Sequence, residues 1–271
     1  MTRQGLASSW LSVPIRLGRG MRLFLEHLGS LAWLGWSCLR GAAHLRRSQL
    51  GVLHEVMRNQ VRFTALEAIP LVMLSALLLG GVTLLQVIGR LSSFGAEGYL
   101  SELMALLVVR ELGPLLVAVI VVGRSGTAIA AEMASMKLEQ EVAALYAIGV
   151  DPITYLVVPR VLGGMVSLFA LVVLFDLVAL VGGFLVASLQ IHLSFPLYVR
   201  ALEAAIGPVE LAGTLAKALA FGAVIPLISA HAGLRLKVSA TEIPQAVTRA
   251  AVDSMVAIFL LGAVISVICY A

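Results

Sequence analysis

Two parts of this chain place charged side chains where an apolar setting makes them costly. Arg110 and Glu111 are adjacent within an otherwise apolar run, and the 22 residues of Thr127–Ile148 carry four more charges between two apolar runs. A charge at the centre of a bilayer costs roughly 2.5–3.5 kcal/mol on insertion scales. We therefore expect Thr127–Ile148 to form one helix outside the hydrocarbon, offering its charges to a soluble partner. The four residues are Glu132, Lys137, Glu139 and Glu141.

The apolar runs around these charges are long enough to cross a membrane. Sixty per cent of the residues are hydrophobic, 13% are charged, and the mean hydropathy is +1.02, far from the values of a soluble domain. We therefore predict an all-α integral membrane protein with about five transmembrane helices, an N-terminal interfacial amphipathic helix and the cytoplasmic helix at 127–148. The expected spans, each near or above 20 residues, are Ile69–Ile88, Leu103–Val122, Tyr155–Leu189, Leu211–Ser229 and Ala250–Tyr270.

The first 60 residues have a different pattern, in which Arg alternates with Leu, Trp and Phe. The apolar run Leu31–Leu39 is too short to span a bilayer. This pattern is typical of a helix in the membrane interface, and a disordered basic tail is the alternative. We therefore divide the chain into an interfacial region, 1–60, and a transmembrane domain, 61–271. The apolar positions at near-helical spacing are Trp10, Leu17, Phe24, Leu28 and Leu31.

The distribution of Lys and Arg predicts the orientation in the membrane. With the N-terminus inside, fifteen of the 19 basic residues are cytoplasmic, and only Arg90 and Arg200 are outside. Five spans then place the C-terminus outside. We expect no removable signal peptide, because the first long apolar run begins near Ile69. The net charge of +4 reflects this asymmetry and does not indicate nucleic acid.

Further polar residues within the apolar runs call for a structural explanation. Asp176 and Lys217 each fall in the outer half of a span, and we predict a buried ion pair between them. Cys38 and Cys269 lie at opposite ends of the chain and are expected to be inert apolar residues rather than a disulfide. The His, Cys, Asp and Glu residues show no spacing typical of a metal site.

An enzymatic function has one weak motif in its favour. Gly123–Gly126 matches the GxSG pattern of intramembrane serine proteases, with His231 as a nominal base. Such a protease needs its serine in a helix embedded in the membrane, whereas the following helix carries four charges. We expect Ser125 to cap that helix instead. The chain has no phosphate-binding G-x-x-x-x-G-K-[ST] motif, so ATP hydrolysis would belong to a partner.

Several motifs together closely resemble the MlaE/YrbE family of ABC permeases, which move phospholipids or other lipids across the bacterial envelope. The resemblance runs from about Leu50 to the C-terminus and departs at His231–Val247, where the family usually has a glycine-rich loop. Glu141–Ala144 followed by Gly149 also echoes the EAA loop by which ABC importer permeases bind their ATPases. The motifs are Arg110–Pro114, Gly123–Gly126, Ala130–Met133, Glu141, Val150–Pro152, Pro159-Arg160, Asp176 with Gly182-Gly183, Lys217 with Phe221-Gly222, and Thr248–Ala250.

This resemblance implies a permease subunit that is itself not an enzyme and binds no cofactor. It implies a homodimer in the bacterial inner membrane, with a cytoplasmic ATPase that binds ATP below each coupling helix and an MCE-domain protein on the outer face. A small STAS-type regulatory protein is a further candidate partner. The assembly would move phospholipid between the inner membrane and the MCE-domain protein, supporting outer-membrane lipid homeostasis. The alternative function is a self-sufficient secondary transporter or channel for an apolar solute, although repeated broken helices are not evident.

The resemblance also assigns candidate residues to two sites. We expect Arg110 to bind a lipid phosphate through its planar fork, and Glu111 to make a structural or gating contact, because adjacent helical residues point about 100° apart. The lipid-binding candidates are Leu84, Leu85, Val87, Ile88, Val109, Arg110, Glu111 and Leu112. The ATPase-coupling candidates, with Met133 and Met136 expected as exposed, adaptable contacts, are Glu132, Met133, Met136, Lys137, Glu139 and Glu141.

Overall fold

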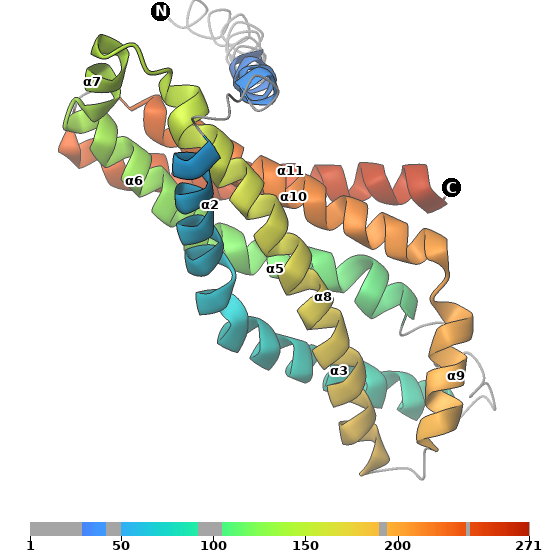
Figure 1. Ribbon diagram of the computed structural model, residues 1–271. Helices are drawn as coiled ribbons and strands as arrows, with labels where there is room; N and C mark the ends of the chain where they lie inside the picture. The colour runs from blue at the N-terminus through green and yellow to red at the C-terminus, as the bar shows by residue number, and fades with distance from the viewer. Residues whose placement is uncertain (1–28, 42–49, 92–104, 190–193, 237–238, 271) are drawn as a thin grey trace, which may run out of the picture.

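The described part of the chain is a bundle of long helices. The computed structural model describes residues 29–41, 50–91, 105–189, 194–236 and 239–270, and every regular element in these residues is helical (Figure 1). Five helices are long and apolar enough to cross a membrane, which confirms the predicted all-α class and the number of spans. They are His54–Gln86, Leu106–Leu138, Ile153–Val186, Pro208–Leu234 and Ile243–Cys269.

The first span changes direction near its start. It consists of α2 (Leu50–Thr64), the short 3₁₀ turn η2 (Leu66–Ala68) and α3 (Ile69–Leu91). Pro70 in the first turn of α3 has no N–H to donate to the carbonyl of Leu66, so the α-helical pattern breaks there. Figure 1 shows α2 and α3 running at an angle to each other.

The second span is one continuous helical rod built from η5 (Ala105–Leu112), α5 (Gly113–Val121), η6 (Val122–Gly126) and α6 (Thr127–Leu138), in which η5 and η6 are π-helical. At 1.5 Å per residue, the 33 residues from Leu106 to Leu138 extend for about 50 Å. A hydrocarbon core is only about 30 Å thick, so we place the α6 end of the rod outside it.

A single helix over Thr127–Ile148 is therefore a wrong prediction. The helix begins within the second span and ends at Leu138. The chain then reverses at Gln140, which has a left-handed φ of 64°, and α7 (Glu141–Ala147) follows as a separate short helix. Gly126 does not interrupt the rod, because it packs against Ser229 of α10 and stays in the right-handed helical region.

Gly149 and Asp151 separate α7 from the next helix. Gly149 has a φ of 76°, its N–H donates to the carbonyl of Tyr146, and Val150 N–H donates to the carbonyl of Leu145, both at 3.0 Å. This is a Schellman ending. The Asp151 carboxylate then accepts hydrogen bonds from the backbone N–H groups of Ile153 and Thr154, at 3.2 Å each, and so caps the start of the following helix.

The remaining helices are η7 (Ile153–Val157), α8 (Val158–Ser188), α9 (Phe195–Ala205), α10 (Pro208–Leu234), η8 (Ala240–Glu242) and α11 (Ile243–Tyr270). α8 is central and packs against α2, α3, α5 and α10 (Figure 1). Gly164 and Gly222 make the α8–α10 approach possible. A Cβ on Gly164 would lie 2.5 Å from the carbonyl oxygen of Gly222, so only glycine fits.

An amphipathic helix over residues 29–41 packs against the bundle. Leu34 and Cys38 are buried, whereas the side chains of Trp33 and Trp36 are 63% and 56% exposed. Gly41 lies against Thr154 just before α8. This agrees with an interfacial helix. The predicted contacts at Trp10, Leu17, Phe24 and Leu28 lie outside the described residues.

Both cysteines are free thiols, as the sequence predicted. Burial raises the pKa of the Cys38 thiol to about 11, which keeps this thiol protonated and unreactive at neutral pH.

Candidate functional site

A cluster of charged side chains joins η5, α10 and α11. Glu111 is at its centre: Oε2 lies 2.9 Å from Nζ of Lys217, and Oε1 lies 3.5 Å from Nε of Arg110. The hydroxyl of Ser266 on α11 donates to the same carboxylate at 2.9 Å. With two cations and one carboxylate, these residues carry a formal charge of +1.

A proline explains why this cluster also needs donors from α10. Pro114 has no N–H, so it leaves the carbonyl of Arg110 without its α-helical partner and the carbonyl of Val109 without its π-helical partner. Two side chains of α10, one turn apart, replace them. Lys217 Nζ donates to the Arg110 oxygen at 2.7 Å, and Thr214 Oγ1 donates to the Val109 oxygen at 3.1 Å. No water is available in hydrocarbon for this purpose, so α10 is bound to the second span.

The predicted ion pair between Asp176 and Lys217 is wrong. Lys217 is fully buried and turns toward Glu111. Asp176 on α8 instead packs against Gly113, where a Cβ would lie 2.5 Å from Asp176 Oδ1. Among the described residues, this oxygen has no hydrogen-bond partner.

The expected divergence of Arg110 and Glu111 is also wrong, because the two side chains form an ion pair with each other. Both belong to the π-helical η5. The i→i+5 hydrogen bonds of a π-helix give a wider turn, so consecutive side chains diverge less than in an α-helix.

The other lipid-binding candidates differ in accessibility. Leu84 and Val109 have 0% and 3% of their surface exposed and pack inside the single chain. The prediction that these two side chains line a lipid cavity is therefore wrong. Leu85 and Leu112 are half-buried, and the side chains of Val87 and Ile88 lie outside the described residues. The side chains of Arg110 and Glu111 are 23% and 34% exposed.

The coupling candidates lie at the opposite end of the rod, and the prediction that Met133 is exposed is wrong. Met133 is fully buried, because this face of α6 packs against Gly233 of α10. Lys137 Nζ donates to the carbonyl of Leu234 and thereby joins α6 to the end of α10. Met136 is half-buried, whereas Glu139 and Glu141 are exposed where the chain turns into α7.

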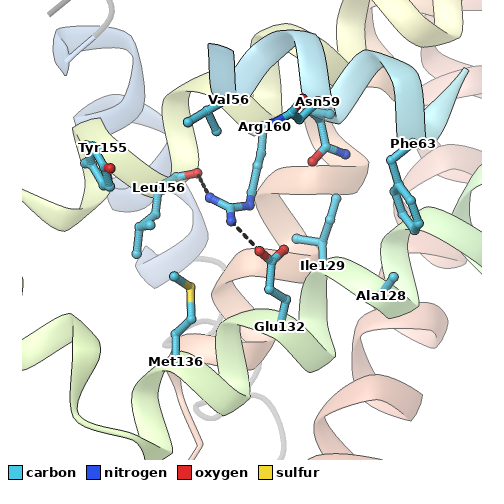
Figure 2. A pocket seen from close by; sticks show the side chains of 11 residues that line it. Val56, Asn59, Phe63, Ala128, Ile129, Glu132, Met136, Tyr155, Leu156 and Arg160 are labelled. Carbon is cyan, nitrogen blue, oxygen red and sulfur yellow. Dashed lines mark hydrogen bonds and ion pairs between the residues drawn. The ribbon is translucent and has the colours of Figure 1, made fainter. Parts of the chain in front are cut away.

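Glu132 is held in an ion pair inside a groove between α2, α6 and the start of α8 (Figure 2). Its Oε1 lies 2.8 Å from a guanidinium nitrogen of the buried Arg160, which also donates to the carbonyl of Leu156 at 2.6 Å. Glu132 therefore braces α6 against α8. The groove has a volume of about 530 Å³ and is lined by Val56, Asn59, Gln60, Phe63, Ala128, Ile129, Glu132, Met136, Tyr155, Leu156 and Arg160.

The sequence interpretation missed two exposed apolar residues at this end. Tyr146 and Ile148, in and just after α7, are 61% and 74% exposed. They lie in a short, largely apolar segment between Glu141 and Asp151, outside the long apolar runs, and this was the signal that could have identified them. A short exposed helix that carries such side chains is suited to docking against another protein.

The motif that suggested a serine protease forms no catalytic pair. Ser125 is 1% exposed and its Oγ has no hydrogen-bond partner among the described residues. The His231 ring nitrogen Nε2 lies 3.1 Å from the hydroxyl of Ser30 instead. Ser125 does not cap α6 either, because η6 and α6 are continuous and no side-chain cap is formed.

Five long apolar helices, a polar cluster near one end and a short exposed helix at the other are the features of a multi-pass helical membrane protein. Comparison with known proteins identifies which kind. Residues 57–268 match the family described as Permease MlaE, so the chain belongs to the MlaE permease family. It is therefore the non-catalytic membrane subunit of an ABC transporter, which implies a separate ATPase partner.

Proteins similar to this chain occur in bacteria and in a plant. A probable ABC transporter permease protein of Rickettsia prowazekii is 34% identical over 202 residues, covering 74% of this chain and 78% of that protein. The intermembrane phospholipid transport system permease protein MlaE of Haemophilus influenzae is 31% identical over 170 residues, 63% of each chain. The chloroplastic protein TRIGALACTOSYLDIACYLGLYCEROL 1 of Arabidopsis thaliana is 27% identical over 208 residues, covering 77% of this chain and 59% of that protein.

Proposed function

We propose that this permease moves phospholipid between the bacterial inner membrane and an MCE-domain partner on the outer face, and thereby supports outer-membrane lipid homeostasis. The observation that carries the proposal is the charged cluster at Glu111. Its net charge is positive, and it lies in spans that otherwise present apolar surface. An amphiphile with an anionic headgroup and apolar tails matches both properties.

Arg110 is the residue of this cluster that contacts the lipid phosphate. Lys217 is fully buried and is already paired with Glu111 and hydrogen-bonded to a backbone carbonyl, whereas the Arg110 side chain is 23% exposed. A guanidinium can give a phosphate two parallel hydrogen bonds. Glu111 then orients Arg110 rather than contacting the lipid.

The second span transmits ATP-driven movement to this site. The same helical rod carries Arg110 near one end and α6, followed by α7, at the other. The ATPase docks on α7 through its exposed apolar residues, Tyr146 and Ile148. The chain works as a homodimer with its N-terminus in the cytoplasm, and a small STAS-type protein is a further candidate partner.

The test uses the full chain, expressed with its genomic neighbours and purified as a complex. Arg110→Ala should lower the phospholipid that co-purifies by about tenfold, since a hydrogen bond to a charged group contributes roughly 1.5–3 kcal/mol. Arg110→Lys should restore part of it. Arg200→Ala, on the exposed surface of α9, is the matched control and should bind lipid normally. Unchanged lipid content in Arg110→Ala, with the complex intact, would overturn the proposal.

A self-sufficient transporter or channel gains no support from the described residues. The family assignment calls for an ATPase, and the exposed α7 gives that ATPase a place to bind. A lipid-dependent ATPase activity that is lost when Tyr146 and Ile148 are changed would separate the two functions.

A further inference from the structure

Asp176 is a charged residue of the described spans that the proposed function does not use. It lies on α8 in the outer half of the third span, and its Oδ1 is buried without a hydrogen-bond partner among the described residues. A buried polar oxygen without a partner is destabilising, and an intramembrane carboxylate that persists in this state usually has a functional partner. The carboxyl is not sealed off, because the residue is only half-buried.

The position of Asp176 relative to Arg110 suggests what that partner is. Asp176 packs against Gly113, and Gly113 follows Arg110 by three residues, close to one helical turn. Arg110 is in the last turn of the π-helical η5, and Gly113 begins α5, so the two residues lie on adjoining parts of one continuous helix. Glu111 pairs with Arg110 on the side of α10 and α11, whereas Asp176 approaches from α8. Arg110 pairs with Glu111, and the Asp176 carboxyl lies against the same part of the second span, three residues further along the chain.

The arrangement of charges matches a zwitterion. The cluster of Arg110, Glu111 and Lys217 carries a formal charge of +1, and Asp176 adds a carboxylate about one turn away. A phosphoethanolamine headgroup carries a phosphate and an ammonium a few bonds apart, so the phosphate can bind Arg110 while the ammonium reaches Asp176. A purely anionic headgroup, such as phosphoglycerol, would bring no cation to this carboxylate.

We propose that Asp176 binds the ammonium of a zwitterionic aminophospholipid and thereby selects this lipid over an anionic one. The inference rests on the proposed function, since it assigns a headgroup to the same lipid site. Gly113 has a defined part in it, because any side chain at this position would push the Asp176 carboxyl away from the second span.

The experiment compares lipids in the purified complex with those of the membrane from which it came. The wild-type complex should enrich phosphatidylethanolamine over phosphatidylglycerol. Asp176→Asn keeps the shape of the side chain and removes its charge, so it should lower this ratio by about tenfold while total phospholipid is retained. Ser167→Ala is the matched control, because Ser167 is also a buried polar residue of α8 without a partner among the described residues. It should leave the ratio unchanged.

A second measurement needs no variant. Wild-type complex in nanodiscs should bind phosphatidylethanolamine about tenfold more tightly than its N-acetylated derivative, which keeps the phosphate and loses the ammonium charge. Equal binding of these two lipids, or an unchanged lipid ratio in Asp176→Asn, would overturn the role of Asp176 and leave phospholipid transport intact. Failure of any phospholipid to bind would instead count against the proposed function itself.

Discussion

Lys217 offers the sharpest test of how the bundle is held together. The Lys217 side chain is fully buried. Its Nζ forms an ion pair with the Glu111 carboxylate at 2.9 Å and donates a hydrogen bond to the Arg110 carbonyl at 2.7 Å. Lys217→Met preserves the length and most of the volume of the side chain but removes both interactions. Removing one partner of a buried ion pair costs about 3–5 kcal/mol. We take the lower end, because Glu111 is 34% exposed and keeps its hydrogen bond from Ser266.

The stranded backbone carbonyl adds about 1 kcal/mol, so the expected total is about 4 kcal/mol. Native proteins are stable by only about 5–15 kcal/mol, so the loss should be large. On the scale of soluble proteins of similar length, it corresponds to a melting temperature lower by about 10 °C. The assay is thermal unfolding of the detergent-solubilised complex, followed by the monodisperse fraction in size-exclusion chromatography.

A double-mutant cycle identifies the partner of Lys217. Adding Glu111→Gln to Lys217→Met should recover about 2 kcal/mol of the loss, because without Lys217 the Glu111 carboxylate keeps only its longer, 3.5 Å ion pair with Arg110. Adding Asp176→Asn should recover nothing, because Asp176 packs against Gly113 and makes no ion pair in the described structure. Rescue by Asp176→Asn rather than Glu111→Gln would refute the structure's pairing and restore the one expected from the sequence.

Three further predictions follow from other elements. Tyr146→Ala combined with Ile148→Asp should release the ATPase in a pull-down while the melting temperature stays unchanged, because both side chains are exposed; Arg200→Ala, at an exposed residue of α9 far from α7, is the control. Gly222→Leu should abolish monodisperse expression, whereas Gly123→Leu should be tolerated, because a Cβ at Gly222 meets the backbone of Met165 at 2.6 Å and one at Gly123 meets nothing within 4 Å. Asp151→Ala should cost about 1 kcal/mol in thermal unfolding through loss of the helix cap, and Asp151→Asn should restore most of it.

Local signals in the sequence predicted part of this structure well. The five spans follow from apolar length alone. The ending of α7 at Gly149 and the restart at Asp151 also needed no tertiary information, because a glycine at positive φ and a side-chain cap act within a few residues.

The errors concern relations between helices. Whether Lys217 faces Glu111 or Asp176 depends on how α10 is rotated against η5 and α8, and helical spacing within one span does not determine that rotation. The close approach at Gly164 and Gly222 and the π-helical turn of η5 set it instead. For the same reason the four charges of α6 and its surroundings suggested a helix outside the hydrocarbon that offers them all to a soluble partner. In the structure its small apolar residues pack on α10 while Glu132 and Lys137 bind neighbouring helices.

Together these corrections change how the two ends of the molecule are connected. A separate coupling helix would have to act on the lipid site through a loop, whereas the described second span is continuous from Leu106 to Leu138. Under the proposed function, a displacement of α7 by an ATPase would be passed to α6 and along the same rod to Arg110. The rod is not uniform, since π-helical turns lie at η5 and η6, where side chains replace or shift backbone hydrogen bonds. Because Lys217 and Thr214 supply the missing donors at η5, movement of the rod relative to α10 would change the surroundings of Arg110 directly. The proposed lipid site and the packing between these two helices thus share one set of polar contacts.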